Sequence, residues 1–133
     1  MGWKERLQRE YLETDREFMQ QVLPLGTVNS GSFGLIAEAV RYVLVAEGDE
    51  VHIRVDTGAL EEVLSSLTQG GMVVTRKDAE AAVMRFAELW EGKARARGKW
   101  EEVVAQARAA GEVLSELPRP PQRRSLWSWL FGR

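Results

Sequence analysis

The sequence contains no cysteine and only one histidine, and these two scarcities exclude several classes of protein. Without cysteine, the chain has no disulfide, no thiol nucleophile and no cysteine-ligated metal, and its composition fits a reducing compartment. A single histidine, His52, cannot build a histidine-rich metal site. We therefore expect a cytoplasmic protein that holds no metal and no cofactor.

Long apolar runs are also missing. The longest one, YVLVA at 42–46, is far shorter than the roughly 20 residues that a membrane-spanning helix needs. The N-terminal stretch MGWKERLQRE is charged and lacks the apolar segment of a signal peptide. Gly2 is present, but Arg6 stands where a myristoylation signal needs serine or threonine. We expect neither a leader nor a membrane span, which leaves peripheral attachment at the inner face of a membrane as the alternative.

Proline is scarce as well, and three of the four prolines lie within residues 118–121. The charge changes at the same place. Residues 1–117 carry 14 Lys and Arg against 20 Asp and Glu, a net charge of −6, whereas residues 118–133 carry four arginines and no acid. A chain of 133 residues is long enough for one domain with a core. We predict one globular domain over 1–117, a Pro/Arg-rich linker over 118–125 and an amphipathic aromatic tail over 126–133.

Apolar residues at helical spacing dominate the first part of the chain. From Trp3 to Val22 they recur about every 3.6 residues, which predicts one amphipathic helix ended by Pro24 and Gly26. The next segment, GTVNSGSFG at 26–34, lacks the Gly-Lys-Ser/Thr ending of a phosphate-binding loop. We interpret it as a flexible connection or as the start of a helix.

Residues 35–46 fit two structures. They form either one helix, or the end of a helix confined to about 32–41 that is followed by a strand. β-Branched residues on both sides of the turn-like tetrad EGDE favour a β-hairpin over 42–55. The sequence VHIRVD also alternates between apolar and polar residues, as a half-buried strand does.

A further helix is predicted after the hairpin, over 58–68, where Asp56 or Thr57 can cap its first turn. Its buried stripe is expected to comprise Leu60, Val63, Leu64 and Leu67. Two glycines end this helix, and the apolar residues 72–74 that follow them can add a short third strand to the hairpin.

Thr75 opens the longest helical region, because the tetrad TRKD resembles a capping box. Apolar residues then recur at helical spacing up to Leu117, where Pro118 ends the pattern. Gly92 and Gly98 interrupt it, so the region is either a helical hairpin or one long bent helix. These elements together predict an α+β fold, a mainly helical small domain with a short two- or three-stranded sheet and an aromatic C-terminal tail.

Candidates for catalysis are few. His52 lies on a predicted strand and faces away from Val51 and Ile53, and no partner that would orient its ring is visible. We interpret it as an exposed strand residue. Adjacent acidic residues such as Glu61 and Glu62 do not face each other on a helix, so they form no carboxylate pair for acid–base work. We therefore expect that the protein is not an enzyme.

A short basic cluster stands between two tryptophans, Trp90 and Trp100. Its four cations are Lys93, Arg95, Arg97 and Lys99. Such a cluster can grip phosphates while the aromatic rings stack on bases. Both tryptophans, however, are in phase with the apolar stripes of their helices, which favours a helix–helix corner with the tryptophans in the core. Nucleic acid, or an acidic partner, is therefore the less favoured hypothesis, and the acidic domain also argues against it.

The aromatic tail is the clearest candidate for function. A helix this short is not stable alone in water, so we expect the tail to become ordered on a surface. Three surfaces compete: its own domain or a twin subunit, a groove on a partner protein, and an anionic membrane. The predicted partner-binding residues are Arg123, Arg124, Leu126, Trp127, Trp129, Leu130 and Phe131.

These observations lead to one functional hypothesis and two alternatives. We expect a non-enzymatic interaction protein, such as an adaptor, an accessory subunit or a small inhibitor, that docks on a partner protein through its Arg/Trp-rich peptide. The apolar residues of this peptide would anchor it and the arginines would orient it. The alternatives are a peripheral membrane-surface protein anchored by the same tail, and a nucleic-acid-associated accessory protein that uses the basic cluster. A homo-oligomer stays open.

Overall fold

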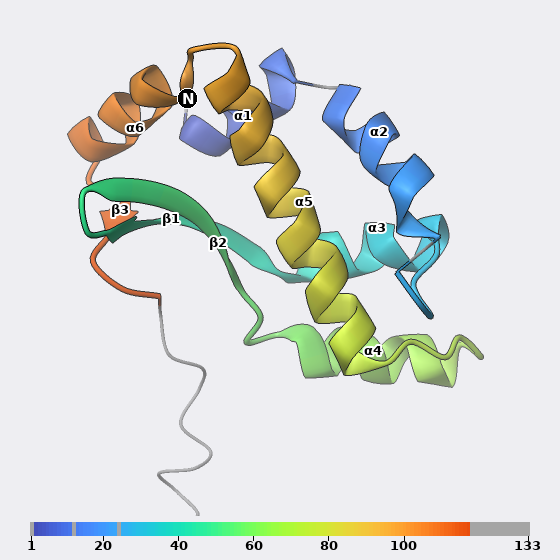
Figure 1. Ribbon diagram of the computed structural model, residues 1–133. Coiled ribbons are helices and arrows are strands. Elements are labelled where there is room, and N and C mark those ends of the chain that lie inside the picture. The colour runs from blue at the N-terminus through green and yellow to red at the C-terminus, as the bar shows by residue number, and fades with distance from the viewer. Residues whose placement is uncertain (1, 12, 24, 118–133) are drawn as a thin grey trace, which may run out of the picture.

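Six helices and a three-stranded sheet make up the part of the chain that the computed structural model describes, residues 2–11, 13–23 and 25–117 (Figure 1). The predicted fold class, a mainly helical small α+β domain, is confirmed. In chain order the elements are α1 (Trp3–Glu10), α2 (Glu13–Val22), α3 (Ser30–Ala39), β1 (Arg41–Glu47), β2 (Glu50–Asp56), α4 (Leu60–Gln69), α5 (Arg76–Ala96), α6 (Trp100–Ala109) and β3 (Val113–Leu114). Helix α5 crosses the sheet beside β2, with α1 and α6 near one of its ends and α4 near the other.

The predicted hairpin is confirmed, and it resolves the ambiguity of residues 35–46. The helix ends at Ala39, and β1 then pairs with β2 in antiparallel register, with Leu44 opposite Ile53. Gly48 alone has a positive φ in the two-residue turn, at 65°, which is the pattern of a type II′ turn. The alternating residues of β2 follow the expected faces, because Val51, Ile53 and Val55 are all buried.

The third strand is not where the sequence predicts it. Residues 72–74 lie in the connection between α4 and α5 and form no strand, and Val73 is 76% exposed. Instead, the chain returning from α6 brings Val113 and Leu114 beside β1, in parallel register with Leu44 and Val45. The sheet order is therefore β2-β1-β3, so that β2 is an edge strand.

The first predicted helix is two helices. α1 ends at Glu10, and Tyr11 takes a non-helical backbone conformation with φ −126° and ψ 48°. The two helices pack on different neighbours, α1 on α6 and α2 on α5, which one straight helix from Trp3 to Val22 would not do. The break between α1 and α2 is therefore caused by tertiary packing, because the helical spacing of apolar residues continues from one helix into the next.

The segment 26–34 is the start of a helix. Asn29 caps α3 with a reciprocal pair of hydrogen bonds to Ser32, as a capping box does. The backbone N–H and the hydroxyl of Thr27 both donate to Asp78 at 2.9 Å, which ties this segment to the first turn of α5. The backbone hydrogen bond from Thr27 lowers the pKa of the Asp78 carboxyl more than any other contact of this side chain does. A side chain at Gly26 would clash with this carboxylate, because an added Cβ would lie 2.3 Å from it.

Helix α4 begins two residues later than predicted. The side chain of Asp56 accepts a hydrogen bond from the N–H of Gly58 and stabilises the turn before the helix, and the N-cap position is Ala59, without a side-chain cap. The buried stripe is otherwise as expected, since Leu60, Leu64 and Leu67 are buried and Val63 is partly buried.

The region after Thr75 forms a helical hairpin, the first of the two predicted alternatives. Thr75 caps α5 by accepting a hydrogen bond from the N–H of Asp78, as predicted. The chain turns at Gly98, where φ is 69°, and α6 begins at Trp100. The helical pattern stops earlier than Leu117, because the chain leaves α6 at Ala109 to form β3.

Aromatic side chains fill the core of the domain. Phe18 packs against Phe33 and Phe86 with ring centroids 4.5 and 5.3 Å apart, and Phe86 contacts Trp90 at 5.1 Å. All eight aromatic residues before the linker are at least 94% buried, which accounts for every aromatic residue outside the tail. These aromatic residues belong to one continuous core cluster of the described residues.

Replacing Gly34 with alanine should raise the free energy of unfolding by about 0.5–1 kcal/mol. Gly34 lies inside α3, where glycine is less favourable than alanine by about that amount. An added Cβ would meet nothing within 4 Å. Urea unfolding followed by far-UV circular dichroism measures the change. Gly48→Ala is the matched control, and it should lower stability because a positive φ strains any residue with a Cβ. A loss of stability in Gly34→Ala would contradict the open space at this position.

Candidate functional site

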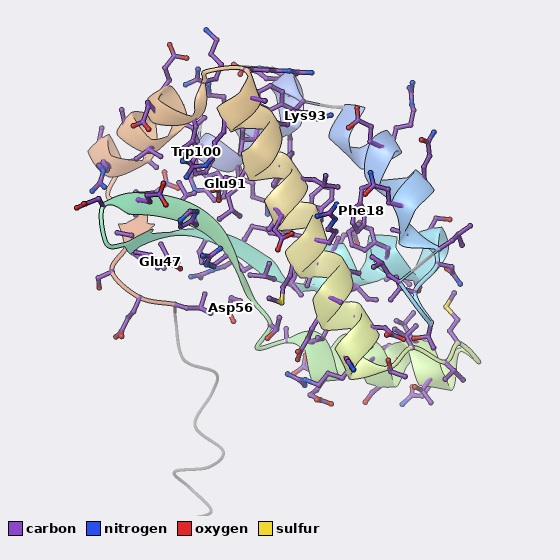
Figure 2. All side chains as sticks on the ribbon, in the orientation of Figure 1. Phe18, Glu47, Asp56, Glu91, Lys93 and Trp100 are labelled. Atoms are coloured by element: carbon purple, nitrogen blue, oxygen red, sulfur yellow. The ribbon has the colours of Figure 1, made fainter. Side chains whose placement is uncertain are left out.

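Glu91 is the centre of a buried polar network that joins α5 to the hairpin (Figure 2). Its carboxylate accepts a hydrogen bond from the backbone N–H of Ile53 at 2.9 Å and one from Arg95 Nε at 2.8 Å. His52 Nδ1 lies 2.7 Å from the same carboxylate. A buried carboxylate with these partners is fixed in place, because removing it would leave several polar groups without an acceptor.

The network corrects the interpretation of His52 as an exposed residue without a partner. His52 is half-buried, and its two ring nitrogens face two carboxylates: Nδ1 faces Glu91, and Nε2 lies 3.3 Å from Glu50 Oε2. The contact of Nδ1 with Glu91 joins β2 to α5, whereas Glu50 belongs to the same strand as His52.

The surroundings of Glu91 lower the pKa of its carboxyl. Burial raises its pKa, but hydrogen bonds from the Ile53 N–H, from His52 and from Arg95 together outweigh burial, so the net pKa lies below the ordinary value. The folded domain therefore contains a buried negative charge, and Arg95 supplies the positive charge beside it.

The same elements cover one half of the outer edge of β2. The N–H of Ile53 donates to Glu91, while the carbonyl of Val51 accepts from Arg95 Nη2 and from Trp100 Nε1, both at 3.1 Å. An uncovered strand edge is a template for pairing with another strand, and proteins often block such edges with side chains. Here the blocking contacts fall on Val51 and Ile53.

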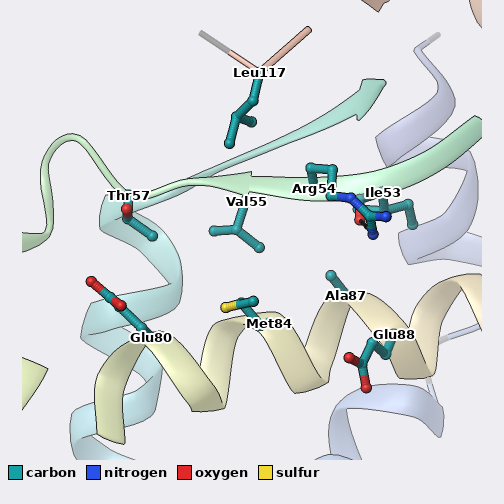
Figure 3. Close-up of a pocket in the computed structure, with 9 residues that line it drawn as sticks. All are labelled: Ile53, Arg54, Val55, Thr57, Glu80, Met84, Ala87, Glu88 and Leu117. Carbon is teal, nitrogen blue, oxygen red and sulfur yellow. Dashed lines mark hydrogen bonds between the residues drawn. The ribbon is translucent and has the colours of Figure 1, made fainter. Parts of the chain in front are cut away.

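The other half of this edge lies in an open groove of about 260 Å³ (Figure 3). Strand β2 runs through the groove, with α5 on one side and Leu117 on the other. Met84 is 54% exposed and Leu117 is 41% exposed, so both walls present apolar surface. The lining residues are Ile53, Arg54, Val55, Thr57, Glu80, Met84, Ala87, Glu88 and Leu117. We call this feature the β2 groove, and it is the candidate site of the described domain.

A second hollow of about 510 Å³ lies between α1, α3 and α5. The rings of Phe33, Tyr42, Phe86 and Trp90 contribute to its wall, and Lys4, Gln8 and Glu38 contribute polar groups. The rings belong to the aromatic core described above, and a mixed set of one cation and one anion selects no class of ligand. We therefore base no functional argument on it.

The structure places the four cations of the basic cluster next to different partners. Arg95 pairs with Glu91 and lies 5.2 Å from the centroid of the Trp100 ring. The other three contacts are the ion pair of Lys93 with Glu17, the stacking of Arg97 over Tyr11 at 4.9 Å, and the pair of Lys99 with Glu102 at 3.7 Å. A phosphate bound here would have to compete with these contacts. The prediction that Trp90 and Trp100 belong to the core is confirmed, since both are at least 97% buried.

The predicted partner-binding residues of the tail lie outside the described residues. Leu117, where the described part of the chain ends, is in the wall of the β2 groove. Sequence reasoning did not single out Glu91. Its signal was present, because Glu91 stands four residues after Ala87 and four before Arg95, in phase with the apolar stripe of its helix.

Comparisons with protein-family models, with curated proteins and with solved structures find no match to this chain. None of the helices in the described ranges combines the length and apolar character that crossing a membrane requires. Among the described residues, no three His, Cys, Asp or Glu side chains are grouped so that they could hold a metal ion.

Proposed function

We propose that the protein is a non-enzymatic interaction protein, an adaptor, accessory subunit or small inhibitor, whose aromatic tail binds a partner protein. The observation that supports this most is the packing of the aromatic residues before the linker. All eight are buried and belong to one core cluster made of described residues, which supports a role for Trp127, Trp129 and Phe131 outside that cluster. Large apolar residues beside arginines are the composition in which binding energy concentrates at interfaces.

The arrangement of charges supports the same proposal. The basic cluster is paired inside the domain, whereas the arginines of the linker stand in a segment without any acid. Arg123 and Arg124 precede the apolar residues directly, so an acidic rim around an apolar groove on the partner would complement the peptide. Such charges mainly raise the rate of association and fix the orientation, while the buried aromatic residues supply affinity.

Replacing Trp127 and Trp129 together with alanine should reduce capture of the partner by at least about tenfold, because each is expected to be an anchor residue. The measurement is quantitative co-purification with the full chain and with the W127A/W129A variant as baits. A protein that depends on the tryptophans is then purified, and a synthetic peptide of residues 123–133 should compete for it. The double variant S125A/S128A changes the same peptide without removing an anchor and should capture normally.

Two outcomes would contradict the proposal. Equal capture by the W127A/W129A variant and the unchanged chain would exclude the tail as the contact. A blue shift of tryptophan fluorescence on anionic phospholipid vesicles, lost when residues 118–133 are removed, would assign the tail to a membrane surface instead. The signal is readable because the three tryptophans of the domain are already buried, so that a shift reports on the tail.

A further inference from the structure

The β2 groove has the features of a site for an added strand. Its floor includes the β2 residues Ile53, Arg54 and Val55, about 10 Å of strand, which matches about three residues of an extended partner. Strand edges recognise extended peptides through backbone hydrogen bonds, and the walls beside them select the side chains. Arg54 reaches the carbonyl of Ile53 in a long bond of 3.4 Å, which a bound strand would replace.

The tail has the side-chain pattern that this groove requires. In an extended segment, successive side chains point to opposite faces. In the sequence LWSWLF, Trp127, Trp129 and Phe131 then lie on one face, and Leu126 and Leu130 lie on the other. The groove also has two apolar walls, one on α5 and one at Leu117, with β2 between them (Figure 3). A segment that is apolar on both faces covers both walls at once.

The charges of the groove and of the tail are also complementary. On α5, Glu80 and Glu88 stand one turn before and one turn after Met84, and all three line the same groove. Glu80 pairs with Arg76 and Glu88 with Arg85, but these are exposed pairs, which contribute little and can be exchanged for pairs with the tail. The cation of the groove, Arg54, is paired with Glu47. The linker brings Arg123 and Arg124 next to the apolar residues and contains no acid. The apolar centre with an acidic side chain on each side therefore fits an apolar peptide that is flanked by arginines.

We propose that the aromatic tail docks in the β2 groove of its own domain, as an extended strand along the edge of β2 at Ile53–Val55. Leu117 lines the groove and directly precedes the linker, so the tether is the eight residues 118–125. Fully extended, eight residues reach about 26 Å, which is more than twice the length of this edge. Because the linker begins next to Leu117 in the wall of the groove, the tail of the same chain is held near the groove, which favours the chain's own domain over a second copy.

Docking of the tail in its own groove adds regulation to the proposed function, and it rests on that function because both require the tail to be a binding peptide. If the tail occupies its own groove, a partner must displace it, and the groove then regulates access to the peptide. Met84→Lys should disrupt docking, because it removes apolar surface and repels the arginines. The new lysine can pair with Glu80 and Glu88 on the same helix face, so α5 should stay folded. Capture of the partner should therefore increase in this variant.

A single nitroxide spin label tests the docking directly. The chain has no cysteine, so Ser128→Cys creates one attachment site between the two tryptophans of the tail. With the label in place, the ¹⁵N amide signals of Val55, Thr57 and Met84 should lose most of their intensity, and reduction of the nitroxide should restore them. Adding Met84→Lys should abolish the effect. The matched control is Leu35→Lys, which changes a 50% exposed leucine on α3, outside the groove, and should leave the effect unchanged.

The other outcomes overturn the proposal. Unchanged groove signals, or losses that persist in the Met84→Lys variant, would exclude the groove as the docking site. A mixture of ¹⁵N-labelled chain without nitroxide and unlabelled chain with nitroxide separates the two sources of the tail. Signal loss that occurs only in this mixture would assign the groove to the tail of a second copy and overturn docking on the same chain.

Failure of the docking proposal can be distinguished from failure of the proposed function. Unaffected groove signals together with tryptophan-dependent capture of a partner would reject docking and leave the function in place. The opposite result is a Met84-dependent loss of the groove amide signals with capture of the partner that is unchanged when Trp127 and Trp129 are replaced. It would reject the proposed function and leave the docking proposal in place.

Discussion

Replacing Trp100 with alanine should lower the free energy of unfolding by about 3–5 kcal/mol, the range for removing a large buried aromatic side chain. Trp100 is 97% buried at the start of α6, its indole N–H donates to the carbonyl of Val51, and Arg95 lies over its ring. The substitution thus leaves a cavity and uncovers part of the β2 edge. Urea unfolding followed by far-UV circular dichroism measures the loss without relying on tryptophan fluorescence.

Trp100→Phe separates the two contributions. It keeps most of the ring but removes the N–H, and Val51 retains its second hydrogen bond, from Arg95. We expect a loss of about 1–2 kcal/mol for this variant, the scale of one hydrogen bond with some lost packing. If Trp100 were instead held outward to stack on bases, both variants would unfold at nearly the same urea concentration as the unchanged chain. That result would contradict the placement of Trp100 in the core.

The two tryptophans illustrate what apolar spacing can predict. Trp90 and Trp100 are in phase with their helical stripes, and both are buried. The hairpin was favoured over a continuing helix, because β-branched residues stand on both sides of a turn-like tetrad and Val51, Ile53 and Val55 alternate with polar residues after it. In these segments, local periodicity and the final packing agree, so the sequence alone was sufficient for the fold class.

The predictions from the sequence are wrong where contacts between distant parts of the chain determine the local structure. β3 has only two residues, Val113 and Leu114, which is too short for any periodicity to be visible, and it forms because α6 returns the chain to β1. The break after α1 likewise follows from packing on α6. The partners of His52 come from another part of the chain, since Glu91 stands on α5, and no local pattern shows that contact.

The candidate site was predictable only in part. The composition of the tail was evident from the sequence, but the β2 groove depends on Met84 and Leu117, which lie 33 positions apart and on opposite sides of an edge strand. The contacts along the outer edge of β2 also differ between its two halves. Glu91, Arg95 and Trp100 cover Val51 and Ile53, and the groove begins where this cover ends.

Glu91→Ala should destabilise the domain by about 2–4 kcal/mol near neutral pH. The substitution removes the acceptor of the Ile53 N–H and the charge partner of Arg95, and leaving such groups unpaired in a buried site is costly. Glu88→Ala is the matched control on the same helix. Glu88 is exposed and pairs only at the surface, 3.3 Å from Arg85, so this variant should lie within about 0.5 kcal/mol of the unchanged chain.

The pH dependence gives this prediction a second, independent readout. Because the pKa of Glu91 is lower in the folded domain than its ordinary value of 4.5, ionised Glu91 favours folding. The resulting stability is fully present above that ordinary value and is lost as the pH falls through the lower, folded-state pKa. The unchanged chain should therefore lose stability on acidification, and its advantage over Glu91→Ala should stay constant down to about pH 4.5 and shrink as the pH falls from there through the lower, folded-state pKa. An advantage that also stayed constant below about pH 4.5 would mean that packing by the side chain, and not the carboxylate charge, joins α5 to the hairpin.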